Sequence, residues 1–151
     1  LCSKADLLMP NITEASFLLD RTFRKGPYNR QEVIQILKDL SGLGPSQIVL
    51  TGVYFDDERL GAACYDKKTE QIHFAFSTYV HQQFHGTGDV FGSFLVAAMM
   101  NNFVLQDAIV FAVELTQQAI ERTIERQTLL KDGVDFEGVI PEMIHKLGLS
   151  S

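Results

Sequence analysis

The residues with the clearest chemical potential lie in a short glycine-containing segment, Phe84–Gly92, with the sequence Phe-His-Gly-Thr-Gly-Asp-Val-Phe-Gly. Gly86 and Gly88 allow backbone N–H groups to approach an anion closely. The apolar run Val90–Met100 predicts a buried helix, whose first turn adds unpaired N–H groups and the positive end of its dipole. Asp89 places a carboxylate at this corner, where it could take a proton from an attacking hydroxyl. The segment therefore suggests phosphate chemistry.

The same segment also has a purely structural interpretation. Aspartate is common in the first turn of a helix because its charge complements the dipole. Gly-Thr-Gly before a helix is often only a tight turn. Short glycine motifs also occur by chance in many proteins, so the segment alone leaves both interpretations open.

A second polar cluster follows a predicted strand near the start of the chain. The apolar run before Pro10 predicts a buried strand, and Asn11–Leu19 predicts a helix capped by Asn11 or Thr13. Ligands of open α/β sheets bind beyond the carboxyl ends of strands, so Asn11 and Glu14 could both face one. The alternative is that this pair only caps the helix.

Between these clusters the sequence predicts a helix, a strand and a hairpin. Thr51 and Gly52 are expected to close the strand, and a hydroxyl and a glycine there fit phosphate contact or an ordinary turn. The predicted segments are residues 30–40 for the helix, 47–50 for the strand, and 53–65 with 70–79 for the hairpin or meander.

Three helices are predicted after residue 86, at 90–100, 105–126 and 139–147. The first is apolar on most sides and should lie in the core. The order of strands, loops and helices predicts that the strands ending at Pro10 and Thr51 lie parallel in one sheet. The helices that start near Thr13 and Thr87 should pack against that sheet.

The composition limits the possible functions. The 151 residues suffice for one domain with a substantial core, and 46% hydrophobic with 21% charged residues is ordinary for a soluble globular protein. The net charge of −6 and the lack of a basic run argue against a nucleic-acid partner. Cys2 and Cys64 show no metal or redox spacing, which suits a reducing cytoplasm.

The ends and the apolar runs give further expectations. The longest apolar run, at 90–100, is too short to span a bilayer, and the first residues lack the pattern of a signal peptide. The chain begins with Leu1 in what looks like the end of a helix leading into a strand. We therefore expect a piece of a larger protein.

Taken in order, these segments resemble the ribokinase-like superfamily and, within it, the pyridoxal kinases. The matching motifs are Met-Pro-Asn-Ile-Thr-Glu-Ala at 9–15, Ile-Val-Leu-Thr-Gly at 48–52 and His-Gly-Thr-Gly-Asp-Val-Phe at 85–91, and the similarity runs from Ala5 to Leu147. The resemblance implies a three-layer α/β/α sandwich, present in part. Complete members are nearly twice as long, so residues 1–151 are expected to be the carboxyl-terminal half of one kinase domain.

The resemblance also implies roles for the polar residues. Asp89 is similar to the base that deprotonates the substrate's hydroxymethyl group. Position 52 is more often serine in these kinases, so this chain lacks that hydroxyl. The other implied roles are an anion hole at Gly86, Thr87 and Gly88, magnesium organised through water by Asn11 and Glu14, and ATP contacts from these two residues and from Thr51, Gly52 and Phe84.

The implied reaction is ATP-dependent phosphorylation of the 5′-hydroxymethyl group of pyridoxal, pyridoxine or pyridoxamine, with Mg²⁺. A monovalent cation is a further candidate cofactor, and the full-length kinase would be a cytoplasmic homodimer without membrane or nucleic-acid partners. Related hydroxymethylpyrimidine kinases commonly carry cysteine where this chain has Asp89, which favours a B6 vitamer. The alternatives are a kinase for hydroxymethylpyrimidine or a sugar, and a nucleotide-binding fragment without turnover.

Overall fold

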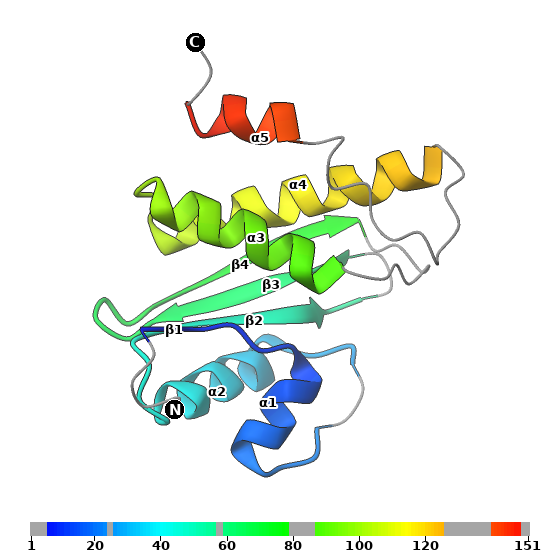
Figure 1. Cartoon of the computed structure of the whole chain (residues 1–151). Coiled ribbons are helices and arrows are strands. Elements are labelled where there is room, and N and C mark those ends of the chain that lie inside the picture. Colours follow the sequence, from blue (N-terminus) through cyan, green and yellow to red (C-terminus); the bar gives the residue numbers. More distant parts are fainter. Residues whose placement is uncertain (1–5, 24–25, 57–58, 79–86, 126–139, 149–151) are drawn as a thin grey trace. The chain divides into compact units, whose positions relative to one another are not determined.

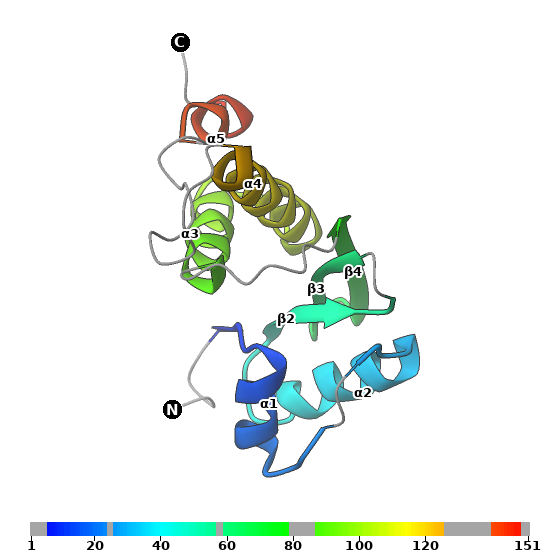
Figure 2. The same cartoon turned by 90° about the vertical axis from the view of Figure 1, so that its right-hand side faces the viewer.

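The computed structural model describes residues 6–23, 26–56, 59–78, 87–125 and 140–148. The chain divides into two units, Leu1–Tyr79 and Val80–Ser151. In the described part, the first unit combines a four-stranded sheet with two helices, and the second contains helices (Figures 1 and 2). The predicted α/β class is therefore confirmed.

The sheet of the first unit has the strand order β1-β2-β3-β4. Strand β1, Leu7–Leu8, pairs in parallel with β2, Gln47–Tyr54. The next two strands, β3 at Arg59–Asp66 and β4 at Gln71–Thr78, continue as an antiparallel meander. Both the parallel pairing of the first two strands and the meander agree with the sequence prediction.

The prediction that Thr51 and Gly52 close the second strand is wrong, because β2 continues to Tyr54. Gly52 forms a bulge: the pairing with β3 shifts register between Thr51 and Val53, and Gly52 has a φ of 72°. The parallel partner ends near Pro10, whereas β3 still offers backbone groups beyond that point. Pairing with β3 therefore extends the strand, and the glycine accommodates the left-handed backbone at the bulge.

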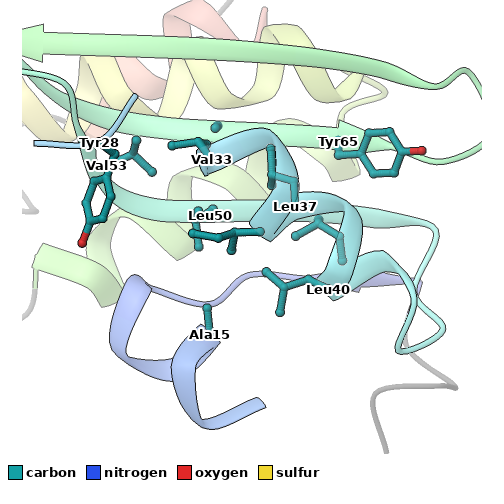
Figure 3. Close-up of a cluster of buried hydrophobic side chains, with 11 residues drawn as sticks. Ala15, Tyr28, Val33, Leu37, Leu40, Leu50, Val53 and Tyr65 are labelled. Carbon is teal, nitrogen blue, oxygen red and sulfur yellow. The ribbon is translucent and has the colours of Figure 1, made fainter. Parts of the chain in front are cut away.

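Helices α1, Ile12–Leu19, and α2, Arg30–Ser41, lie on the same face of this sheet (Figures 1 and 2). The amphipathic pattern of α2 places one row of apolar side chains against the strands, as Figure 3 shows for Val33, Leu37 and Leu40. Ala15 is the buried residue of α1. The buried cluster consists of Ala15, Tyr28, Val33, Ile36, Leu37, Leu40, Ile48, Leu50, Val53, Ala63 and Tyr65.

The second unit contains α3, Thr87–Met100, α4, Leu105–Glu125, and α5, Ile140–Lys146. Its first two helices pack together, with the rings of Phe94 and Phe111 edge to face and their centroids 6.4 Å apart. All three helices were predicted, with bounds that differ by a few residues. The packing of α3 against the sheet stays a prediction. Among the described helices, none combines the length and apolar character needed to cross a membrane.

Candidate active site

The turn from β1 into α1 is closed by a reciprocal pair of hydrogen bonds. The Glu14 backbone N–H donates to Asn11 Oδ1 at 2.7 Å, and the Asn11 backbone N–H donates to Glu14 Oε1 at 3.1 Å. Asn11, and not Thr13, is thus the cap, and the pair forms a capping box. Both side chains are exposed, and the second carboxylate oxygen of Glu14 takes no part in the box.

Thr51 lies beside this turn at the carboxyl end of the parallel strands. Its backbone N–H donates to the Pro10 carbonyl oxygen at 3.0 Å, and a parallel bridge joins Thr51 to Asn11. The Thr51 hydroxyl is 3.5 Å from the same carbonyl oxygen, so that hydrogen bond is weak at best. Gly52 follows, exposed, and an added Cβ would meet no atom within 4 Å. The structure thus brings Asn11, Glu14, Thr51 and Gly52 together at one end of the sheet, beyond the carboxyl end of β1.

The second group of predicted residues begins α3. Thr87 is the first residue of the helix, and Gly88 and Asp89 are exposed in its first turn. Among the described residues outside its own helix, none has an atom within 4 Å of a Cβ added at Gly88. The Asp89 carbonyl oxygen accepts a hydrogen bond from Ser93 Oγ at 2.9 Å, inside the helix. The Asp89 carboxylate therefore stands at the positive end of the helix dipole, open to solvent.

The group at Asn11, Glu14, Thr51 and Gly52 lies in the first unit, and the group at the start of α3 lies in the second. Two predicted site residues, Phe84 and Gly86, lie outside the described residues, as does the side chain of Thr87. Each described group combines a helix start with an exposed carboxylate, that of Glu14 at α1 and that of Asp89 at α3.

The oxygen atoms of Asn11 and Glu14 suit magnesium, which prefers oxygen ligands. In the part of the chain that the structure covers, no group of three or more His, Cys, Asp or Glu side chains could enclose a metal ion. Magnesium usually keeps several waters and takes one or two protein carboxylates together with substrate phosphates. An exposed pair with one uncommitted carboxylate oxygen fits that mode of binding.

Cys64 can be excluded as a nucleophile. It is 1% exposed within β3. The pKa of its thiol is raised to about 12, chiefly by burial; a hydrogen bond to the backbone of His73 acts against this rise, and the nearby Asp66 carboxylate adds to it. Since the thiolate is the reactive form, this cysteine is inert at neutral pH.

Sequence reasoning did not foresee two backbone features of the site, the carbonyl oxygen of Pro10 that receives Thr51 and the bulge at Gly52. The bulge had a recognisable signal, because an isolated glycine inside an otherwise continuous strand pattern often marks one. The role of Pro10 had no such signal, since it depends on the register between two strands that are far apart in sequence.

Comparisons with known proteins bear on the chain's family. The model of a family described as phosphomethylpyrimidine kinase matches residues 1–132. The comparison with curated proteins gives no match. A solved structure of a provisionally assigned phosphomethylpyrimidine kinase from Bacteroides thetaiotaomicron, crystallised with pyridoxal, is 25% identical with a TM-score of 0.85, covering 99% of this chain and 51% of that one.

Two pyridoxal kinases have the same fold. That from Lactobacillus plantarum is 20% identical with a TM-score of 0.83, covering 96% of this chain and 51% of that one. That from Leishmania donovani, in complex with ADP and pyridoxamine, is 24% identical with a TM-score of 0.81, covering 96% and 50%. This chain spans about half the length of these solved structures. With the family match extending over residues 1–132, the chain belongs to the phosphomethylpyrimidine kinase family and has its ribokinase-like α/β fold.

Proposed function

We propose that residues 1–151 form the carboxyl-terminal half of one ribokinase-like kinase domain, which phosphorylates the 5′-hydroxymethyl group of pyridoxal, pyridoxine or pyridoxamine with ATP. The observation that carries the proposal is the exposed carboxylate of Asp89 in the first turn of α3, directly after Gly88 with its open surroundings. Family membership gives this helix start a chemical context that the sequence motif alone lacks.

In this proposal Asp89 is the general base. Its carboxylate takes the proton from the substrate hydroxyl as the hydroxyl oxygen forms a bond to the γ-phosphorus of ATP. The bond from that phosphorus to the bridging oxygen breaks, and ADP leaves with the electron pair. Exposure suits the role, because the group must meet a substrate that arrives from solvent.

The backbone N–H groups at Gly86, Thr87 and Gly88 form the anion hole for the transferring phosphoryl group. The first residues of a helix have N–H groups without partners within the helix, and their dipoles favour negative charge. Such donors are most effective when they are fixed before the reaction begins. Because no described residue outside the helix lies within 4 Å of a Cβ added at Gly88, this part of the chain leaves room for a phosphate close to its backbone.

The nucleotide phosphates bind at the end of the sheet where Asn11, Glu14, Thr51 and Gly52 lie. Phe84 borders the nucleotide. Asn11 and Glu14 hold magnesium through water, and the bound ion supplies neutralisation of the phosphate charge. The capping box fixes the Glu14 side chain in advance, so little side-chain freedom is lost when the ligand binds. A monovalent cation, a homodimer of the complete kinase and a cytoplasmic location remain part of the proposal.

A second candidate substrate is hydroxymethylpyrimidine, which the description of the matching family favours. Asp89 argues for a B6 vitamer, since related hydroxymethylpyrimidine kinases commonly carry cysteine at this position. A kinase for a sugar would share the same nucleotide site and differ in the acceptor alcohol. A nucleotide-binding chain without turnover would keep the nucleotide site and phosphorylate no acceptor.

The test is a substrate panel with the complete kinase, magnesium and ATP, followed by ADP release and by mass spectrometry of the product. The panel contains pyridoxal, pyridoxine, pyridoxamine, hydroxymethylpyrimidine and ribose. We expect the three vitamers to give the largest kcat/KM and a product one phosphoryl group heavier. Preference for hydroxymethylpyrimidine or ribose would replace the substrate assignment. Nucleotide binding without any phosphorylated product would refute the catalytic proposal.

A further inference from the structure

Helix α1, which carries Glu14, has little packing to hold it. Of its eight residues, Ala15 is the buried one, and the side chain of Phe17 is 80% exposed. Ile12 and Leu19 are only partly buried against the cluster beneath them. So few buried apolar groups leave a short helix free to tilt, because burial is what usually fixes a surface helix.

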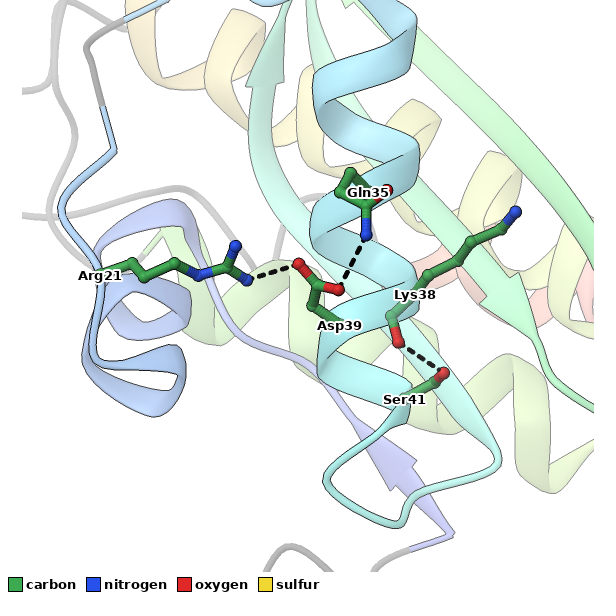
Figure 4. A network of polar contacts seen from close by, with 5 residues as sticks. All are labelled: Arg21, Gln35, Lys38, Asp39 and Ser41. Carbon is green, nitrogen blue, oxygen red and sulfur yellow. Dashed lines mark hydrogen bonds and ion pairs between the residues drawn. The ribbon is translucent and has the colours of Figure 1, made fainter.

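The carboxyl-terminal end of α1 is tied to α2 by a polar network (Figure 4). Asp20 ends the helix in the left-handed conformation, with φ 51°, and the Arg21 backbone N–H then donates to the Ser16 carbonyl oxygen at 3.0 Å. This turn brings the Arg21 guanidinium to Asp39, where Nη2 donates to Oδ2. Gln35 Nε2 donates to the other oxygen, Oδ1, at 2.8 Å.

Asp39 projects from the most firmly packed helix of the unit. Three side chains of α2, those of Val33, Leu37 and Leu40, are fully buried in the cluster against the sheet. Gln35 lies on the same helix and donates to Oδ1, so the Asp39 carboxylate has an anchor that does not involve Arg21, and Oδ2 accepts from Arg21. The pair thus joins a weakly packed helix to a rigid one.

We infer that Arg21 and Asp39 are positioning residues that hold α1 so that Glu14 faces the magnesium and nucleotide of the proposed function, on which this inference rests. At one end of α1 the capping box sets the Glu14 side chain relative to its own backbone. At the other end the pair sets the helix relative to the sheet. An exposed ion pair usually adds little to global stability, so its loss should act on ligand geometry more than on folding.

The experiment uses Arg21→Ala, Asp39→Ala, the double variant and Arg21→Lys. A matched control is Arg59→Ala, since Arg59 also pairs with an aspartate, Asp56, and lies over the ring of Phe76 as Arg21 lies over that of Phe23. Each protein is measured in two ways: hydrogen exchange of the α1 amides, and titration with a non-hydrolysable ATP analogue with and without magnesium.

We expect faster exchange in α1 and a Kd for the nucleotide with magnesium raised on the order of tenfold, the lower end of the cost of removing a group that orients a metal ligand. The increase should be smaller without magnesium, the double variant should be no worse than either single one, and Arg21→Lys should recover part of the loss. The midpoint of thermal unfolding should fall by less than about 4 °C.

The outcomes separate this inference from the proposed function. All variants are made in the complete kinase, and if the wild-type kinase binds no nucleotide, the proposed function itself is wrong. If it binds and Arg21→Ala binds equally well, whether or not α1 exchange changes, only the positioning role is wrong. An equal loss of affinity in Arg59→Ala would also overturn the role, because that ion pair lies in the β2–β3 hairpin and not on α1.

Discussion

The backbone N–H of Thr51 donates to the carbonyl oxygen of Pro10 at 3.0 Å, and this bond carries the parallel pairing of β1 and β2 past the end of β1, between residues 41 apart in sequence. Asn11, the cap of α1, follows Pro10 directly. The Thr51 hydroxyl is therefore held beside the Asn11–Glu14 turn by backbone pairing, whatever its own hydrogen bonding. Removing that hydroxyl should leave the strand pairing in place.

Thr51→Val should weaken nucleotide binding without harming the fold. Valine keeps the β-branched shape, and the hydroxyl makes only a 3.5 Å contact with Pro10, so stability should change by less than about 1 kcal/mol. Loss of a hydrogen bond to a charged phosphate should raise the nucleotide Kd about tenfold. Thr69→Val, in the exposed turn between β3 and β4, is the matched control. Equal affinities for all three proteins in calorimetric titration would remove Thr51 from the site.

Asp89→Asn should lower kcat by roughly 10²–10⁴-fold, because the amide has similar size but cannot accept the substrate proton. The nucleotide Kd should stay the same or fall slightly, since a negative charge near the phosphates is lost. Asp107→Asn is the control, because Asp107 is an exposed aspartate in the first turn of α4 and its loss changes net charge and helix dipole equally. Near-normal kcat in Asp89→Asn would leave Asp89 as a helix-start residue only.

Gly88→Ala should weaken nucleotide binding while leaving the folded chain intact. The added methyl group lies more than 4 Å from every described residue outside its own helix, and alanine is the better helix former, so stability should not fall. Any loss of affinity would then report a phosphate that approaches the Gly88 backbone. Unchanged affinity in Gly88→Ala would argue against an anion hole at this residue.

Gly61→Ala should instead disrupt the sheet. Its Cβ would lie 1.8 Å from the carbonyl oxygen of Ala75 in the neighbouring strand β4. Since that atom belongs to backbone, the strands must move apart, and we expect a loss of about 3 kcal/mol or more, the upper end of the cost of overpacking. Chemical denaturation of both glycine variants measures the contrast. Equal stability of Gly61→Ala and Gly88→Ala would show that β3 and β4 can move apart at little cost in free energy.

Cys64 should make stability fall at alkaline pH. Its pKa is raised in the folded state from 9.0 to about 12, so the folded chain retains a proton that the unfolded chain releases. The buried, protonated thiol therefore contributes to the free energy of unfolding. This contribution is fully present below pH 9 and is lost as pH rises toward 12. In a Cys2→Ser background, the free energy of unfolding should decline less steeply with pH after Cys64→Ala. If the free energy of unfolding declined equally in both proteins between pH 8 and about 10.5, the raised pKa of Cys64 would be contradicted.

Much of the fold could be predicted because local patterns are strong. The apolar spacing of Val33, Leu37 and Leu40 indicated α2, and the polar turn at Asn11 indicated the start of α1. The parallel pairing of β1 with β2 followed from the helical connection between them, which consists of α1 and α2. In these segments, sequence preference and tertiary contact favour the same structure.

What could not be predicted depends on contacts between distant residues. The strand continues past Gly52 because β3 pairs with it, and no pattern within residues 47–54 indicates that partner. Arg21 meets Asp39 across 18 residues because of the left-handed turn at Asp20. For Asn11 and Glu14, capping and ligand binding require the same side chains at the same spacing, so sequence alone could not separate the two uses.

The bulge at Gly52 bears on how the length of this chain can change during evolution. Before it, the register of β2 is fixed from both sides, by β1 and by β3. After it, β3 is the paired neighbour, and the strand runs into a hairpin turn. An inserted or deleted residue beyond Val53 can be absorbed by that turn, whereas one between Gln47 and Thr51 would shift Thr51 away from Pro10 and move the apolar side chains to the wrong face. Homologous sequences should therefore vary in length in the hairpin and keep a constant length in the first half of the strand.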